Sequence, residues 1–234
     1  MTAMKQRFNK YLKNKRGQVF LVCTVIIIIY MLSFITIVYE LNLTQFSKNT
    51  EIKDFQSSYE NFKTETSNFM KSMLANYSQI TTIIDSNATA GQLLEDWLNF
   101  AEQQMFAKGY FAVFEINEII PITTPIELVK GNGFLSITAN IDVYLECNYL
   151  SIDVELQNYF RYELSYTNTA TTAEINFYYV TLLNTIYMGY SQVTVNSLAT
   201  LNLNNGTYIY SSPLVATDVV EGITSDQIIV TLVV

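Results

Sequence analysis

The sequence predicts an α+β protein with a single N-terminal transmembrane helix, a helical stalk and an external antiparallel β-sandwich-like domain of about eight strands. Three patterns predict this class. A long uncharged apolar run lies near the N-terminus, apolar residues then recur at steps of three and four, and after Gly109 the period changes to two. We therefore expect a basic leader (1–17), a membrane helix (18–39), a stalk of two helices (40–108) and a β-domain (109–234).

The apolar run has the length and composition of a membrane-spanning helix. The 22 residues from Gln18 to Tyr39 carry no charge and include four consecutive isoleucines. As a helix they would extend roughly 33 Å, close to the roughly 30 Å hydrocarbon core of a bilayer. A secretory signal would end at a small-residue cleavage site, which FITIVYEL lacks, so we expect the run to be retained.

Charge is distributed unevenly along the chain and predicts its orientation. All 21 acidic residues lie at or beyond Glu40, whereas six of the 13 basic residues precede Gly17: Lys5, Arg7, Lys10, Lys13, Lys15 and Arg16. Because basic flanks stay in the cytoplasm, we expect a cytoplasmic N-terminus and an extracellular body on a single-pass cell-membrane protein. The lipid bilayer is thus an expected partner. Nucleic acid is not, since it requires clustered Lys and Arg.

The residues KRGQ at 15–18 carry a resemblance to a known family. They resemble the class III signal peptide of archaeal type IV pilin-like proteins, and the likeness covers about the first forty residues. The resemblance implies that a prepilin peptidase cuts between Gly17 and Gln18 and recognises Lys15 and Arg16 as the flank. It also implies a long N-terminal helix laid across a sheet and, in a filament, packed against other pilin-like subunits.

A permanently retained anchor is the alternative to cleavage. In that case KRG is an ordinary positive flank and Gly17 marks the start of the membrane helix. Val22 keeps this alternative open, because many pilins carry a glutamate at the equivalent fifth mature position.

A first amphipathic helix is expected beyond a polar break. ELNLTQFSKNTE, at residues 40–51, carries Asn and Thr, which favour helix ends, so we expect the membrane helix to stop here. From residue 52, apolar residues form one helical stripe, which either packs on the chain's own β-domain, as we favour, or binds another subunit. The stripe consists of Ile52, Phe55, Tyr59, Phe62, Thr66, Phe69, Met73, Ile80 and Ile83.

A second helix is expected after the turn-forming stretch DSNATAG at 85–91. Gly109 is its expected C-terminal stop. We expect Trp97, the only tryptophan, to close the core against the sheet. The buried face of this helix comprises Leu94, Trp97, Leu98, Ala101 and Met105.

The body alternates with a period of two, which predicts long, half-buried antiparallel strands. The inward phase changes near residues 147–150, which calls for a tight turn or a bulge, and TNTATTA at 167–173 is the next expected loop. The inward residues are Ile137, Ala139, Ile141, Val143 and Leu145, followed by Ile152, Val154, Leu156, Phe160, Tyr162 and Leu164.

Two further strand signals lie near the C-terminus. Asn205-Gly206 predicts a type I′ hairpin that pairs Leu203 with Tyr208 and Leu201 with Tyr210. The chain ends on IIVTLVV, an apolar strand that would be an aggregation hazard at an open edge. We therefore expect this strand to lie inside the sheet or to be covered by the helix or a neighbouring subunit.

Little in the sequence indicates chemistry. There is no histidine, and since Cys23 lies inside the apolar run whereas Cys147 lies far into the body, we expect no internal disulfide. No phosphate loop, nucleophile elbow or metal motif occurs, so we expect no enzymatic activity, catalytic residue, cofactor or metal site. The loose acidic clusters in FEINE and DVVEGITSD are interpreted as solvated strand faces; they comprise Glu115, Glu118, Asp218, Glu221 and Asp226.

Glycosylation sequons lie beyond the membrane segment, where the body is expected to be external. Asn76, Asn87 and Asn205 are the possible acceptors, whereas Asn42 lies too close to the bilayer. Together these features predict a membrane-anchored, pilin-like extracellular protein with a structural or adhesive role, either a filament subunit or a minor pilin. The alternative is a single-pass anchored β-domain that binds a partner and does not polymerise.

Overall fold

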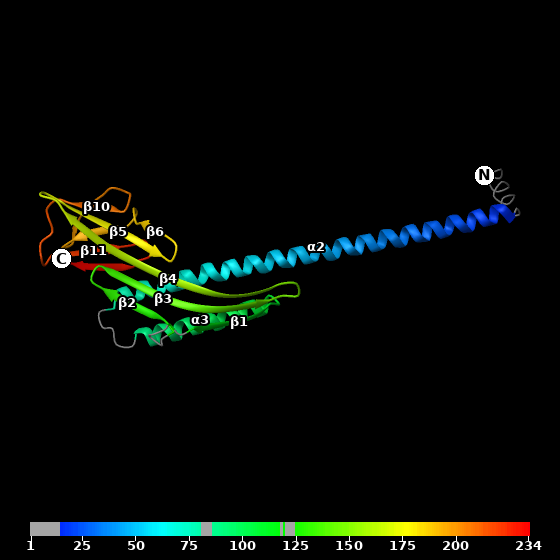
Figure 1. Cartoon of the computed structure of the whole chain (residues 1–234), viewed down its shortest axis with the longest axis horizontal. Helices are drawn as coiled ribbons and strands as arrows, with labels where there is room; N and C mark the ends of the chain where they lie inside the picture. Colours follow the sequence, from blue (N-terminus) through cyan, green and yellow to red (C-terminus); the bar gives the residue numbers. More distant parts are fainter. Residues whose placement is uncertain (1–14, 81–85, 118, 120–124) are drawn as a thin grey trace. The chain divides into compact units, whose positions relative to one another are not determined.

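The computed structural model describes residues 15–80, 86–117, 119 and 125–234, and the side chains of residues 15–18 and 86 lie outside the description. In this part of the chain two helices and 12 strands are present (Figure 1). The chain divides into two units, residues 1–54 and 55–234. The expected α+β class, with a long apolar N-terminal helix and antiparallel sheets, is confirmed, but the estimate of about eight strands was too low.

Helix α2 (Lys15–Ser78) is continuous, so the expected polar break at residues 40–51 was wrong. The polar side chains there are compatible with the helix because they bond to its own backbone. Thr44 and Thr50 donate their hydroxyl protons to the carbonyl oxygens four residues earlier, at 2.9 and 3.0 Å. Intrinsic helix propensity predicts helix ends only weakly, and the 12 residues at 40–51, whose propensities are mixed, continue the helix.

Helix α3 (Ser86–Ala107) begins inside the stretch that was expected to form a turn. Its expected stop at Gly109 is confirmed. Gly109 has φ +85°, its N–H donates to the Phe106 carbonyl at 2.9 Å, and the Tyr110 N–H donates to the Met105 carbonyl at 3.0 Å. This pair of bonds is the Schellman motif, which requires a left-handed residue and therefore favours glycine.

Replacing Gly109 by alanine is expected to lower the free energy of unfolding by about 1 kcal/mol. A Cβ atom at this position meets nothing within 4 Å, so only the backbone conformation opposes it. Urea unfolding of the detergent-solubilised chain measures the loss. Gly109→Asn is the control, because asparagine tolerates the left-handed region and should lose less. Equal losses in both variants would contradict this account.

The larger of two antiparallel sheets has eight strands and the order β1-β3-β4-β5-β10-β9, with β2 paired to β3 and β6 to β5. Its strands are β1 (Phe111–Asn117), β2 (Glu127–Gly131), β3 (Phe134–Glu146), β4 (Ser151–Asn168), β5 (Ala173–Thr181), β6 (Thr185–Tyr187), β9 (Leu201–Asn202) and β10 (Thr207–Tyr210). The smaller sheet has the order β12-β11-β7-β8. Its strands are β7 (Gln192–Val195), β8 (Leu198–Ala199), β11 (Val219–Ile223) and β12 (Ile229–Val233).

The two longest strands, β3 and β4, follow the predicted alternation. Leu145 pairs with Ile152 across a tight turn, in which the Cys147 N–H donates to the Leu150 carbonyl at 2.9 Å. The expected change of phase is therefore confirmed. Val154 departs from the expectation because it is 38% exposed. Val154 lies in the first half of β4, which pairs with β3 alone, because β5 pairs with β4 only from Phe160 onward.

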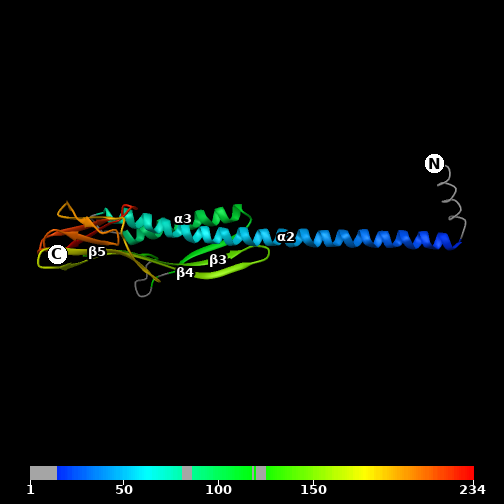
Figure 2. The ribbon, with the colours of Figure 1, turned by 90° about the horizontal axis from the view of Figure 1, so that it is seen from above.

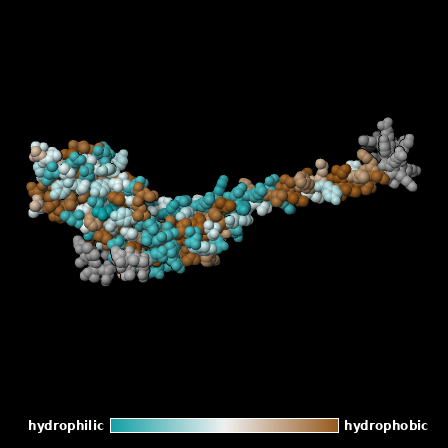
Figure 3. All heavy atoms as spheres, in the orientation of Figure 1, coloured by the Kyte–Doolittle hydropathy of each residue, from teal (hydrophilic) through white to brown (hydrophobic). Residues whose placement is uncertain are grey.

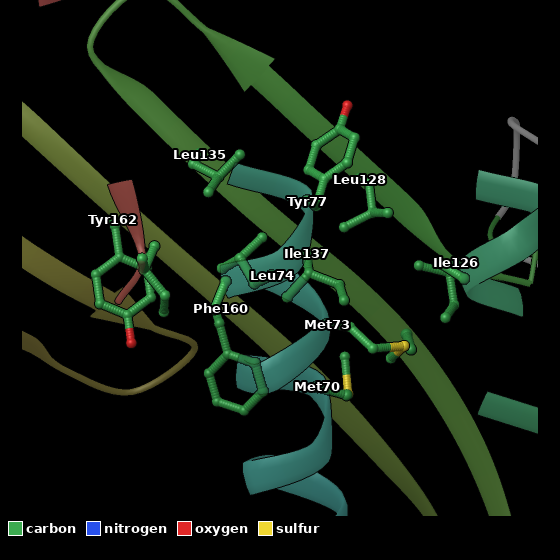
Figure 4. Packing of buried hydrophobic residues seen from close by; sticks show 14 of the residues in the cluster. Met70, Met73, Leu74, Tyr77, Ile126, Leu128, Leu135, Ile137, Phe160 and Tyr162 are labelled. Atoms are coloured by element: carbon green, nitrogen blue, oxygen red, sulfur yellow. The ribbon is translucent and has the colours of Figure 1, made fainter. Parts of the chain in front are cut away.

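The C-terminal part of α2 supplies much of the core of the second unit. Figure 2 shows this part of α2 and α3 on the same side of the β3–β4 pair. In Figure 4, Met70 and Leu74 lie over Ile137 and Phe160 of the sheet, and all four are buried. The expectation that the stripe packs on the chain's own β-domain is confirmed. Ile80 departs from the expectation because it is 46% exposed. Ile83 lies outside the described residues, so its position stays a prediction.

Trp97, which was expected to close the core against the sheet, packs on α2. Its ring stacks on Phe69 with centroids 5.3 Å apart, and its indole N–H donates to Thr66 Oγ1 at 3.3 Å. The amphipathic indole is satisfied here because it needs an apolar face and one acceptor. The other four residues of the predicted face of α3 are buried.

The hairpin around Asn205-Gly206 has a different register from the predicted one. Tyr208 pairs with Asn202, and Ile209 pairs with Leu201. The Leu203 N–H donates to the Thr207 carbonyl at 3.0 Å, so the loop contains three residues and not two.

Local side-chain bonds explain the longer loop. Asn204 and Gly206 both have positive φ, at +60° and +85°. The Asn204 N–H donates to Asn202 Oδ1 at 2.7 Å, and the Thr207 N–H donates to Asn205 Oδ1 at 3.0 Å. Asparagine side chains favour such turns by bonding to backbone two residues on. The bonds made by the Asn202 and Asn205 side chains therefore favour a loop that is one residue longer than the predicted turn.

Strand β12 is an edge strand whose free side is covered. The Ile229 N–H donates to Ser78 Oγ at 3.1 Å, and the Gly133 N–H donates to the Thr231 carbonyl at 2.8 Å. Asn132 exchanges two bonds with the backbone of Val233, at 2.6 and 2.8 Å. The expectation that the apolar C-terminal strand is covered is confirmed, with α2 and the β2–β3 turn as the cover.

Candidate functional site

The N-terminal part of α2 is the most distinctive surface of the described chain. From Val19 to Phe46 its side chains are exposed, and most of them are large and apolar. In the described residues, α2 is the one helix that is long and apolar enough to cross a membrane. Figure 3 shows this run as largely hydrophobic. An apolar surface of this extent marks contact with lipid or with other proteins.

Between Val19 and Tyr39, the serine and threonine side chains of this run are satisfied within the helix. The hydroxyl groups of Thr24, Ser33 and Thr36 donate to the carbonyl oxygens four residues earlier, at 2.9, 2.9 and 3.0 Å. An unsatisfied hydroxyl would be costly in hydrocarbon, where no water can bond to it. These three side chains are therefore compatible with an apolar environment.

The predicted processing residues lie at the start of α2. The helix begins at Lys15, so Lys15, Arg16, Gly17 and Gln18 form its first turn. Their side chains, and the leader residues 1–14, lie outside the described residues. Cleavage after Gly17 therefore stays a prediction.

The sequon asparagines occupy three different settings. Asn76 is exposed in the last turn of α2, whereas the hydroxyl of its sequon residue Ser78 is buried and donates to the Ala75 carbonyl at 2.6 Å. Asn87 is half-buried, and its Oδ1 accepts the Leu128 N–H at 3.0 Å. Asn87 thus joins the start of α3 to β2.

Asn205 is exposed in the β9–β10 loop. The hydroxyl of Thr207, its sequon threonine, donates to Asn176 Oδ1 at 2.9 Å. Exposed loops are where folded proteins can meet modifying enzymes. Whether any of the three is glycosylated stays a prediction.

The loose acidic clusters separate into unrelated positions. Glu115 is exposed on β1, Glu118 lies outside the described residues, and Glu221 is half-buried on β11. The carboxylate of Asp218 accepts the Val215 N–H and the Asn196 side-chain amide, each at 2.8 Å. These bonds lower the pKa of Asp218, because they stabilise the charged form. Asp218 therefore holds a loop together.

Strand pairing creates an acidic row that the sequence alone did not reveal. Glu115 of β1 pairs with Asp142 of β3, which pairs with Glu155 of β4. Like charges directly opposite one another destabilise a sheet. Among the described residues, no three histidine, cysteine or acidic side chains converge closely enough to hold a metal ion. The row depends on which residues of β1, β3 and β4 pair with one another, and the alternation within a single strand does not predict that pairing.

No family model, curated protein or solved structure matches this chain. The likeness to pilin-like proteins therefore depends on KRGQ at 15–18 and on the apolar helix that follows it. The functional interpretation therefore relies on three features. They are the exposed apolar run of α2, the packing of the rest of α2 on the β-domain, and the distribution of charge along the sequence.

Proposed function

We propose that this protein is a membrane-anchored, pilin-like surface protein with a structural or adhesive role, as a filament subunit or a minor pilin. One observation carries the proposal. Helix α2 is apolar and exposed from Val19 to Phe46, but from Phe55 onward it is part of the β-domain core. The first part needs lipid or other helices to cover it, and a helix laid across a sheet is what the resemblance implies.

The leader has a physical role in this proposal. Six positive charges hold the N-terminus at the cytoplasmic face, where each contributes about 1 kcal/mol of attraction to an anionic leaflet. Removal of residues 1–17 by a prepilin peptidase deletes all six and makes Gln18 the new N-terminus. The helix can then leave the bilayer and pack among other pilin-like helices, with the β-sandwich-like domain outside the cell.

A second candidate is a single-pass anchored binding module that does not polymerise. The composition of the apolar run favours it. No glycine or alanine occurs between Val19 and Tyr39, and its small polar residues do not recur at a spacing of four. Close approach of membrane helices usually uses small residues at that spacing.

The native N-terminus separates the two candidates. Mass spectrometry of the protein purified from its own cells is expected to find Gln18 as the first residue. A Gly17→Val variant is expected to keep the leader, because the residue at the cut is altered, and Val19→Leu is the matched control that should still be cut. A native N-terminus at residues 1–3 would exclude processing and support the fixed anchor.

Membrane anchoring itself is tested by fractionation. The intact chain is expected to stay with the membranes after alkaline extraction, and protease added to whole cells is expected to digest the chain beyond Glu40. Recovery in the soluble fraction, or protection of the β-domain in whole cells, would refute both candidates.

A further inference from the structure

A polar cleft of about 440 Å³ lies between the last turns of α2 and the loop that joins β11 to β12. Both walls belong to the unit of residues 55–234. Ligand sites commonly have volumes of about 300–1,000 Å³. Its main lining residues are Asn68, Lys71, Asn76, Gln79, Asp226 and Gln227. The cleft lies outside the exposed apolar part of α2 (Val19–Phe46), so the inference goes beyond the proposed function.

The α2 wall presents amide groups at helical spacing. Asn68 and Asn76 lie eight residues apart on one side of α2, and Gln79 follows directly after its last residue, Ser78. In the described part of the chain, none of these amides makes a hydrogen bond with the protein. An amide offers two donors and an acceptor, which suits a ligand whose groups both donate and accept.

The opposite wall is a tight loop with a fixed shape. The Gln227 N–H donates to the Thr224 carbonyl and the Ile228 N–H donates to Thr224 Oγ1, each at 3.1 Å. Gln227 has φ +62°, a conformation that a non-glycine residue seldom adopts. Such strain persists only where the surrounding structure holds it. The loop thus presents Asp226 and Gln227 to the cleft in a defined position.

The charges of the cleft compensate one another. Lys71 is the one cation and Asp226 the one anion among the lining residues. The Lys71 ammonium lies over the rings of Phe160 and Tyr179, 5.7 and 5.5 Å from their centroids. Burial and the charge of Asp226 raise the pKa of Tyr179 to about 12, so the phenol stays neutral at physiological pH. The two charges leave the lining without net charge, so the cleft offers no net attraction to either an anionic or a cationic ligand.

We propose that this cleft binds the sugar rings of a neutral glycan. Each sugar hydroxyl both donates and accepts, which matches the uncommitted amides of Asn68, Gln79 and Gln227. An apolar ligand would leave these groups unpaired, at a cost in affinity. The sugar comes either from a glycan attached to Asn76, which lines the cleft, or from a glycan outside the chain.

The test uses the full chain made without glycosylation and solubilised in a detergent that has no sugar headgroup. Saturation-transfer NMR with neutral oligosaccharides is expected to show binding. Gln227→Gly removes one amide and suits the positive φ, and it should weaken binding about tenfold, as expected for one lost hydrogen bond. Gln104→Ala removes an exposed amide on α3 outside the cleft and should leave binding unchanged.

Three results would overturn the proposal. These are no binding of any neutral oligosaccharide, equal affinity in the Gln227→Gly and Gln104→Ala variants, and inorganic phosphate or free amino acids binding in preference to sugars. The mass of the native Asn76 peptide then identifies the source. If Asn76 carries a glycan, the sugar in the cleft is the chain's own. If the peptide is unmodified, the cleft binds a glycan from outside the chain. Either result is compatible with sugar binding, which the NMR measurement decides.

Discussion

Replacing Phe62 by alanine is expected to lower the free energy of unfolding by about 3–5 kcal/mol. Phe62 of α2 is 4% exposed, and its ring stacks on that of Phe114 in β1, with centroids 4.1 Å apart and planes 12° from parallel. The variant loses the apolar burial and the ring pair and leaves a cavity between the helix and the sheet. A loss of this size would show that α2 is an integral part of the β-domain.

Urea unfolding of the detergent-solubilised chain measures this loss through the fluorescence of Trp97, the only tryptophan, which stacks on Phe69 of α2. Phe106→Ala is the matched control. Phe106 lies on α3 and is 76% exposed, so its loss should stay within about 0.5 kcal/mol. Similar losses in the two variants would mean that the stripe on α2 is not packed in the core.

Replacing Gly206 by alanine is expected to cost about 3 kcal/mol, because two penalties combine. Gly206 has φ +85°, as Gly109 does, so the backbone term is the same at both positions. A Cβ atom on Gly206 would lie 2.4 Å from Tyr187 Cβ and 2.8 Å from the Met188 nitrogen. The backbone must move to relieve this clash. The Gly206 carbonyl accepts the Phe177 N–H at 2.9 Å, so that movement disturbs β5 as well.

The same urea experiment, run on the Gly206→Ala and Gly109→Ala variants, isolates the packing penalty. The difference between their losses is expected to be about 2 kcal/mol, since the Cβ atom meets neighbours at one position only. Equal losses would show that the segment Tyr187–Met188 adjusts freely and that the close approach has no energetic consequence.

The parts of the fold that the sequence predicted best are those with sustained periodicity. Strand β3 spans 13 residues with five inward apolar positions, and all five are buried. Long runs of this kind average out local exceptions. Gly109 was equally predictable, because a glycine after an amphipathic stretch meets the conformational requirement of a helix end.

Short elements and pairings between strands could not be predicted in this way. Strands β6 to β12 contain two to five residues each, too few for alternation to be visible, which explains why the strand count was too low. The acidic row across β1, β3 and β4 depends on the register. The hairpin register depended on asparagine side chains, whose bonds compete with the two-residue turn that Asn205-Gly206 favours.

The candidate sites also differ in whether they could be predicted from a single segment of the sequence. The apolar run was evident from composition, since a membrane helix needs only length and hydrophobicity. The cleft was not evident, because it joins Asn68 of α2 to Gln227, far later in the chain. In the sequence, its α2 residues are simply the polar face of an amphipathic helix. Nothing in either segment alone indicates that the other lies opposite.

The bonds that enclose β12 have a consequence for the order in which the molecule is completed. Ile229 reaches Ser78 across 151 positions of the chain, and Val233 reaches Asn132 across 101. Contacts of such long sequence separation form slowly, because a large loop must first be ordered. Pairing along the edge of β12 is therefore expected to be a late step in folding. A variant truncated after Ile228 would lack strand β12, so Ser78 and Asn132 would lose the backbone partners that they have in Ile229 and Val233.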